Sequence, residues 1–212
     1  MPRAKIQGKT DETKRRIVLA AIELVVNEGF AALTMSNVAA KLGVTKPAIY
    51  WYFDSKEALI VGINEMVRQE YLSYVNAIAQ NSALGAMEKL ARVVSLAEEK
   101  GGNELSLCIV TMKLLLENLT RDDEITALLR SSYLEYAKGV EQILREGMEE
   151  GVFRKDISPF NTALFLVGAL DGALQQTVLH FGKGRIATNF SEDKGFLLLM
   201  FRQLLCDENK TS

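Results

Sequence analysis

Few residues in this sequence have the types and spacing that catalysis or metal binding requires. His180 is the only histidine, and the two cysteines, Cys108 and Cys206, stand far apart, unlike zinc, redox or disulfide pairs. No serine or cysteine has the glycine-flanked context of a catalytic nucleophile, and no glycine-rich phosphate loop occurs. We therefore expect neither an enzyme nor a cofactor or metal, with catalysis by scattered carboxylates as the alternative.

A different chemistry is indicated in the first quarter of the chain, where cationic and hydroxyl side chains are concentrated. Residues 1–56 carry nine Lys or Arg and five acids, a net charge of +4, so that the remaining residues carry −6 of the overall −2. Ammonium and hydroxyl groups such as those of Lys46, Lys56 and Tyr50 donate to phosphate oxygens and to acceptors on base edges. This asymmetry favours a polyanionic partner, with a solvated basic surface as the alternative.

The elements that must position these groups are two short helices in the segment TMSNVAAKLGVTKPAIYWYF, residues 34–53. Helices that cross over a tight turn need a left-handed residue there, which Gly43 supplies, and a small residue at their close approach, which is Ala39. Pro47 suits the first turn of the second helix. A shared core is expected from Val38, Leu42, Val44 and Ile49, and N-caps from Thr34 and Thr45. The pattern predicts a helix-turn-helix, with a purely structural hairpin as the alternative.

The rest of the chain has the pattern of an all-α protein. It contains three prolines, and no run alternates apolar and polar residues at the spacing of β-hairpins. We predict about nine helices, over residues 11–28, 35–42, 46–52, 55–79, 84–98, 105–119, 122–150, 159–180 and 191–205. Gly29 and Gly151 are expected to end the first and seventh of them, and Ser55 to cap the fourth.

The beginning of the chain and its most apolar windows argue against export or membrane insertion. The first ten residues, MPRAKIQGKT, are basic and polar, and the apolar windows at 165–170 and 196–201 are far shorter than a membrane span. We expect a cytoplasmic protein with no membrane partner.

A set of short motifs surrounds the helix-turn-helix: Glu28-Gly29-Phe30, Leu33-Thr34, Val38-Ala39, Leu42-Gly43-Val44, Ile49-Tyr50, Tyr52-Phe53 and Lys56-Glu57-Ala58-Leu59. Over about residues 11–60, a quarter of the chain, this order resembles the N-terminal domain of TetR-family transcriptional regulators, in which Tyr-x-x-Phe followed by Lys-x-x-Leu is distinctive. The resemblance implies a three-helix DNA-binding domain at residues 11–71, with the helix-turn-helix at 34–53, and a larger helical ligand-binding and dimerisation domain at 72–212.

The resemblance and the faces of the helices together place DNA contacts on the second helix of the motif. Lys46 is expected to reach a guanine edge or a phosphate, and Pro47 or Ala48 a thymine methyl. Trp51 either faces DNA or packs under the helix. The expected DNA-binding residues are Thr34, Thr45, Lys46, Pro47, Ala48, Tyr50, Tyr52 and Lys56.

One expected DNA-binding residue differs from the family pattern, and the N-terminal residues offer a further possible contact. Tyr52 stands where family members often have histidine, which keeps a hydrogen-bond donor but removes titration near neutrality. The N-terminal residues Arg3, Lys5 and Lys9 form either a solvated arm or a further contact to phosphate or groove.

The last two predicted helices have the composition of a subunit interface. One short recognition helix contacts too few base pairs to select a site, so we expect a homodimer on two half-sites. Both helices are rich in apolar or small residues, and the resemblance implies an intermolecular four-helix bundle, with burial inside one subunit as the alternative. The expected interface residues are Val167, Leu170, Ala173, Leu174, Phe196, Leu197, Met200 and Leu204.

The middle helices are expected, from the resemblance, to enclose a site for a small-molecule effector. Methionine and aromatic side chains give an adaptable apolar wall, although most of them would also form a core in the absence of a ligand. Asp171 and Gln175 are either polar groups for the effector or structural residues at the dimer interface. The expected lining is Met87, Leu90, Val94, Cys108, Thr111, Met112, Leu115, Tyr133, Tyr136, Phe165, Asp171 and Gln175.

These expectations together describe a ligand-responsive transcriptional regulator. As implied by the resemblance, it is a repressor that binds a palindromic double-stranded DNA operator and is released by a small, largely apolar effector. The alternatives are an activator of transcription and a helical adaptor that binds protein partners. Steep salt dependence of duplex binding would separate the regulator from the adaptor.

Overall fold

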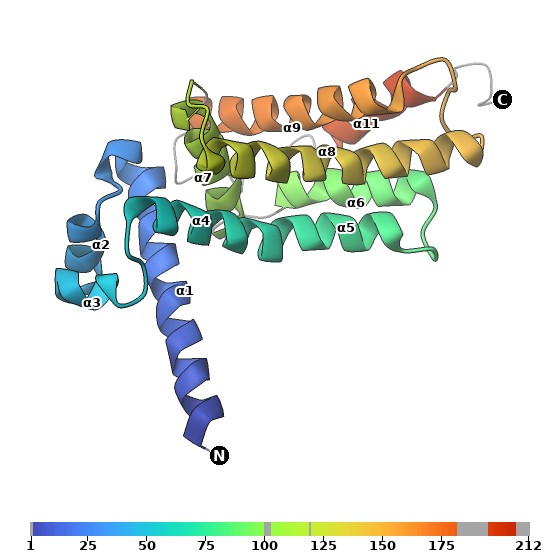
Figure 1. Ribbon diagram of the computed structural model, residues 1–212. Helices are drawn as coiled ribbons and strands as arrows, with labels where there is room; N and C mark the ends of the chain where they lie inside the picture. Colours follow the sequence, from blue (N-terminus) through green and yellow to red (C-terminus); the bar gives the residue numbers. More distant parts are fainter. Residues whose placement is uncertain (1, 100–102, 119, 182–194, 207–212) are drawn as a thin grey trace. The chain divides into compact units, whose positions relative to one another are not determined.

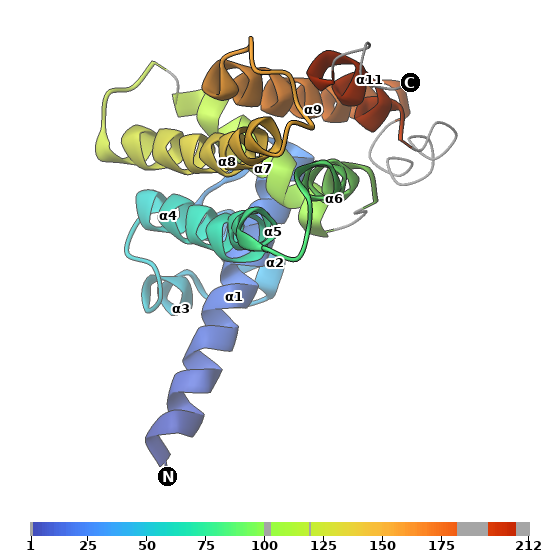
Figure 2. The ribbon, with the colours of Figure 1, turned by 90° about the vertical axis from the view of Figure 1, so that its right-hand side faces the viewer.

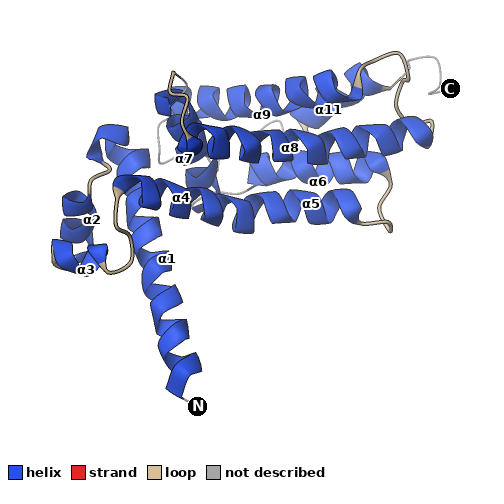
Figure 3. Cartoon of the chain, in the orientation of Figure 1, coloured by secondary structure: helices blue, strands red, loops and turns tan. Residues whose placement is uncertain are grey.

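The computed structural model describes residues 2–99, 103–118, 120–181 and 195–206, and the regular structure in these ranges is helical. Figure 3 shows helices joined by loops and no strand in these ranges. The predicted all-α class is confirmed.

The helices divide between two compact units, which are drawn with their labels in Figure 1. The first unit comprises residues 1–71 and 106–132. It contains α1 (Pro2–Glu28), α2 (Met35–Leu42), α3 (Lys46–Tyr50), α4 (Lys56–Val67), most of α7 (Asn103–Asn118) and the start of α8 (Glu124–Glu149). The second unit comprises residues 72–105 and 133–212, with α5 (Ser73–Gln80), α6 (Ala86–Glu99), the remainder of α8, α9 (Pro159–Phe181) and α11 (Phe196–Leu205).

Most predicted helix boundaries lie within two residues of those observed, and three helices need separate comment. The first helix starts at Pro2 instead of near Asp11, because residues 3–7 are good helix formers and Pro2 suits a first turn. The predicted helix 55–79 is broken by a π-helical turn, Arg68–Leu72, which joins α4 to α5. The last helix is described from Phe196 onward, and the predicted positions 191–194 lie outside the described residues.

One buried cluster organises the first unit. It includes Ile17 on α1, Leu33 before α2, Ile49 on α3 and Ile63 on α4, together with residues of α7 and α8. Lys113 on α7 donates from Nζ to the carbonyl oxygens of Val25 (3.1 Å) and Val26 (3.0 Å). The Val25 carbonyl also accepts from the N–H of Gly29 at 3.1 Å, so Lys113 adds a second donor there. Both carbonyls lie in the last turn of α1, and Lys113 therefore bonds α7 to the end of α1.

The second unit is held by helices that pack around a buried lysine. Lys89 on α6 is 3% exposed and donates from Nζ to the carbonyl oxygen of Ala79 at 2.7 Å, while its ammonium pairs with Glu146 on α8. The lysine therefore joins the end of α5 to α6 and α8. Figures 1 and 2 both show α11 running beside α9.

Candidate nucleic-acid interface and effector residues

The helix-turn-helix begins with backbone geometry that the sequence predicts. Thr34 caps α2, because its hydroxyl accepts from the N–H of Asn37 at 3.1 Å. Gly43 has φ +67° and follows α2, and the next N–H, that of Val44, donates to the carbonyl of Ala39 at 3.0 Å. The left-handed glycine and the small buried Ala39 let α3 cross closely over α2, as predicted.

The small core of the motif contains three of the four predicted residues. Val38 and Ile49 are fully buried, and Leu42 packs against the same cluster while half-buried. Val44 is 45% exposed, so its predicted place in the core is wrong. The left-handed backbone at Gly43 reverses the chain, and the side chain that follows it points outward instead of back into the cluster.

Part of the surface of α3 is left uncovered, although Ile49 on the same helix is buried. Thr45, Lys46, Pro47 and Tyr50 are exposed, and the Lys46 ammonium lies 5.8 Å from the centre of the Tyr50 ring. Thr45 occupies the predicted N-cap position, yet its side chain makes no capping hydrogen bond. The predicted set is therefore presented together on one short helix, with Ala48 half-buried beside it.

Trp51 and Tyr52, at the end of α3, have opposite surroundings. Trp51 is 87% exposed, so the alternative in which it packs under the helix is wrong. Tyr52 is half-buried and packs against the cluster of the first unit.

Lys56, at the start of α4, is already engaged within the protein. Ser55 caps this helix as predicted, accepting from the N–H of Ala58 at 3.1 Å. The Lys56 Nζ lies 3.4 Å from the carbonyl oxygen of Phe30 and 3.8 Å from the centre of its ring. Partial burial lowers the pKa of this ammonium. One of its three N–H groups is used in this way, so the others can still meet a phosphate.

The predicted effector residues of the second unit include a hydrogen-bonded polar pair. Tyr133 on α8 donates from its hydroxyl to Asp171 Oδ2 on α9 at 2.6 Å. Burial raises the pKa of the Asp171 carboxyl, which this hydrogen bond partly opposes, and no described cation pairs with it. Leu90, Val94 and Tyr136 are buried, Met87 is half-buried, and Phe165 and Gln175 are exposed.

The predicted effector residues of the first unit lie on α7. Thr111, Met112 and Leu115 are half-buried, and the Thr111 hydroxyl donates to the carbonyl of Leu107 at 2.8 Å. The side chain of Cys108 lies outside the described residues.

The predicted interface residues divide into covered and uncovered sets. Val167 and Leu170 are buried within the chain, Ala173 and Leu197 are half-buried, and the side chain of Leu174 lies outside the described residues. Phe196, Met200 and Leu204 are exposed, as are two apolar residues not predicted for the interface, Phe165 (61%) and Leu199 (51%). Gly168 and Gly172 on α9 have open space where a Cβ would lie.

Sequence reasoning missed several polar residues in or beside the core. Lys113 is described above, and the side chains of Asn64 on α4 and Ser132 on α8 are buried with no hydrogen-bond partner for Asn64 Nδ2 or Ser132 Oγ. The available signal was a single polar residue on an otherwise apolar helix face, such as Asn64 among Ile60, Ile63 and Val67.

In the part of the chain that the structure describes, no helix is long and apolar enough to cross a membrane.

Comparison with known proteins agrees with this arrangement over most of the chain. Residues 17–63 match the family model for bacterial regulatory proteins of the tetR family, and residues 55–199 match that for the C-terminal region of YsiA-like proteins. A curated relative, the fatty acid metabolism regulator protein of Bacillus subtilis, is 26% identical over 166 residues, which are 78% of this chain and 83% of that protein.

Solved structures share the fold. The MbdR regulator of Azoarcus sp. CIB superposes with a TM-score of 0.74 at 24% identity, over 87% of this chain and 96% of that one. A transcriptional regulator of Saccharomonospora viridis, in complex with choline, gives a TM-score of 0.74 at 21% identity, over 93% and 100% of the two chains. The paired family matches and the helix-turn-helix geometry lead to one conclusion: the chain belongs to the TetR family of DNA-binding transcriptional regulators.

Proposed function

We propose that this regulator is a repressor that binds a palindromic operator as a homodimer and is released by a small, largely apolar effector. The observation that carries the proposal is the exposed surface of α3, where Lys46, Pro47 and Tyr50 stand together while Ile49 anchors the same helix in the core. A short helix that is anchored in the core and presents donors to solvent has the form needed to enter a major groove.

The contacts to DNA divide into reading and positioning. The N-terminal half of α3 approaches the bases, so Lys46 reads a base edge, with Pro47 and Ala48 against thymine methyl groups. The hydroxyls of Thr34, Thr45, Tyr50 and Tyr52 and the remaining donors of Lys56 contact phosphates, which fix the position of the helix on the duplex. Trp51, which is exposed at the end of α3, adds an aromatic side chain beside these DNA-contacting residues.

A homodimer is supported by the apolar surface of α9 and α11. Phe165, Phe196, Leu199, Met200 and Leu204 expose their side chains, and their spacing places the last four on one face of α11. Exposed apolar clusters of this kind mark interaction sites. A second copy would cover this face and set two recognition helices about 34–36 Å apart, one turn of B-DNA.

The effector is supported by the apolar middle helices and by the Tyr133–Asp171 pair. The pair offers a fixed carboxylate among mostly apolar neighbours, which suits an apolar ligand that carries one donor or cationic group. The S. viridis structure is a complex with choline, so a cationic ligand has a precedent among similar proteins.

The experiment that tests the repressor is selection of duplexes from a random pool, followed by fluorescence anisotropy on the enriched site. We expect a palindrome with two half-sites and an affinity that falls steeply with salt, because phosphate contacts release counterions. Enrichment of no duplex, or binding that is insensitive to salt, would favour the adaptor alternative.

Release is tested by linkage. An effector that lowers operator affinity must itself bind more weakly, by the same factor, in the presence of operator. Calorimetric titration of an identified effector with and without the operator measures both affinities. Equal affinities would contradict effector-driven release while leaving DNA binding untouched.

A further inference from the structure

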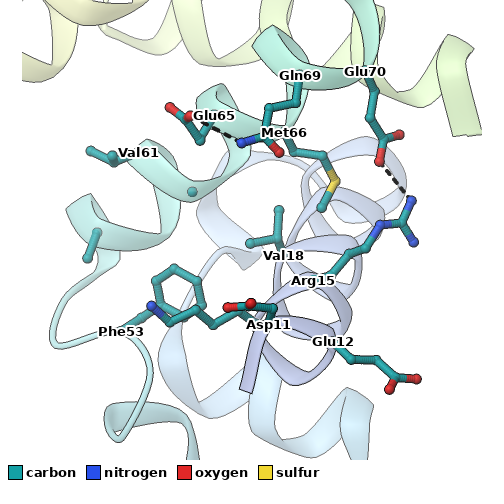
Figure 4. A pocket seen from close by; sticks show the side chains of 13 residues that line it. Asp11, Glu12, Arg15, Val18, Phe53, Val61, Glu65, Met66, Gln69 and Glu70 are labelled. Carbon is teal, nitrogen blue, oxygen red and sulfur yellow. Dashed lines mark hydrogen bonds and ion pairs between the residues drawn. The ribbon is translucent and has the colours of Figure 1, made fainter. Parts of the chain in front are cut away.

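The first unit carries a groove that none of the sites above uses. It has a volume of about 870 Å³ and lies between the middle of α1 and α4, with further residues from the π-helical turn (Figure 4). No residue that lines it belongs to the DNA-binding, effector or dimer sets. Its size falls within the range of about 300–1,000 Å³ that is usual for sites of small molecules.

The floor of the groove is apolar and firmly packed. Val18 and Met66 point into it from α1 and α4, beside the ring of Phe53 (Figure 4). Gly62 allows this arrangement, since a Cβ there would lie 2.9 Å from the Phe53 ring. Val61, which is 41% exposed, continues the apolar surface toward solvent. The groove therefore offers a preformed apolar surface to a ligand.

The rim of the groove is acidic. Asp11 and Glu12 lie on the α1 side, and Glu65 and Glu70 on the opposite side (Figure 4). Arg15 neutralises Glu70 at 2.7 Å, whereas Glu65 accepts only from the amide of Gln69, at 3.3 Å. Among the described residues, Asp11, Glu12 and Glu65 have no cationic partner, and Lys14 is the remaining positive group of the rim.

We propose that this groove binds an organic cation with an apolar body, as a ligand site within the unit that carries α3. The apolar body lies on Val18, Phe53, Val61 and Met66, and the positive charge lies between the Asp11–Glu12 and Glu65 sides. The Phe53 ring adds an attractive surface for a cation. An anion of the same shape meets an excess of carboxylates at the rim and is disfavoured.

The test uses two probes of matched shape and opposite charge, tetraphenylphosphonium and tetraphenylborate, titrated calorimetrically into the full chain without DNA. We expect the phosphonium to bind at one site more tightly than the borate, and to bind more weakly as salt is raised. Glu65→Gln should weaken phosphonium binding by about two- to fivefold, the range of one exposed ion pair. Val61→Trp should block the groove.

Glu57→Gln is the matched control, since Glu57 lies on the same helix but outside the groove. Thermal unfolding of each variant shows that the fold is kept. The proposal fails if the phosphonium does not bind saturably, if the borate binds as tightly, or if Glu65→Gln behaves like Glu57→Gln. If Asp171→Asn removes phosphonium binding and Glu65→Gln does not, the probe occupies the proposed effector site and the groove is not a cation site.

Discussion

Individual side chains on α3 differ in what they contribute to recognition, and Lys46 is the most informative of them. It is exposed and makes no contact that holds the fold together, so Lys46→Ala should leave the unfolding temperature unchanged. If Lys46 reads a base edge, the variant loses about 1–3 kcal/mol of operator affinity and relaxes preference at one position in each half-site. Site selection and anisotropy measure both, with the exposed Lys14→Ala as the control. An unchanged preferred site and affinity would remove Lys46 from the readout.

Unlike the exposed Lys46, Asn64 is buried in the core, and its Nδ2 has no hydrogen-bond partner. An unpaired buried amide costs about 1–3 kcal/mol, so Asn64→Leu should increase the free energy of unfolding by a value in that range. The contrast is Asn118, which is equally buried but donates to the carbonyl of Leu114 at 2.7 Å and accepts from Arg121 at 3.2 Å. Asn118→Leu should therefore destabilise. Urea unfolding of both variants decides, and destabilisation by Asn64→Leu would show that its amide has a partner in solution.

Between helices, the bond from α7 to the end of α1 depends on one lysine. Lys113→Met keeps the length of the side chain and leaves two carbonyls of α1 without their charged donor. We expect a loss of about 1–3 kcal/mol in stability and faster hydrogen exchange in the last turn of α1. Lys138→Met, at an exposed position of α8, should have little effect. Equal stability of the two variants would mean that Lys113 contributes no net stabilisation.

The elements also show how far sequence reasoning reaches. Thr34, Gly43 and Ile49 were predictable, because caps, left-handed turns and core periodicity depend on a few neighbouring residues. Val44 was placed wrongly, since one left-handed residue before it changes the direction of its side chain. The start of α1 was also missed, because Asp11 and Glu12 look like the acidic first turn of a helix, although residues 3–7 allow the helix to begin earlier.

The missed residues of the core had a different cause. The hydrogen bonds of Lys113 join residues 87 and 88 positions apart in the sequence. Asn64 Nδ2 is unpaired because the side chains packed around it offer no hydrogen-bond acceptor. No local pattern encodes either. The groove between α1 and α4 was missed for the same reason, as its lining comes from two segments about 40 residues apart that look like ordinary amphipathic helices.

For the whole molecule, the state of assembly is the main expectation. Phe165→Asp with Leu199→Asp places charges on the exposed face of α9 and α11 and should give a folded monomer, because both side chains are uncovered in the single chain. Leu170→Asp should instead unfold the protein, since Leu170 is buried within the chain. Light scattering and circular dichroism distinguish these results, with the exposed Val152→Asp as the control. A dimer that persists in the double variant would place the interface elsewhere.

The exposure of Trp51 gives the protein an intrinsic fluorescent reporter of DNA binding. It is the only tryptophan in the chain, and 87% of it faces solvent at the end of α3. Excitation near the red edge of the indole band therefore isolates the emission of one side chain at the end of the recognition helix, without a dye or an added mutation. Any duplex that covers this helix should change the emission maximum and shield the indole from iodide, whereas a ligand bound elsewhere should leave both unchanged. Stopped-flow recording of this signal would time the arrival of the helix at DNA.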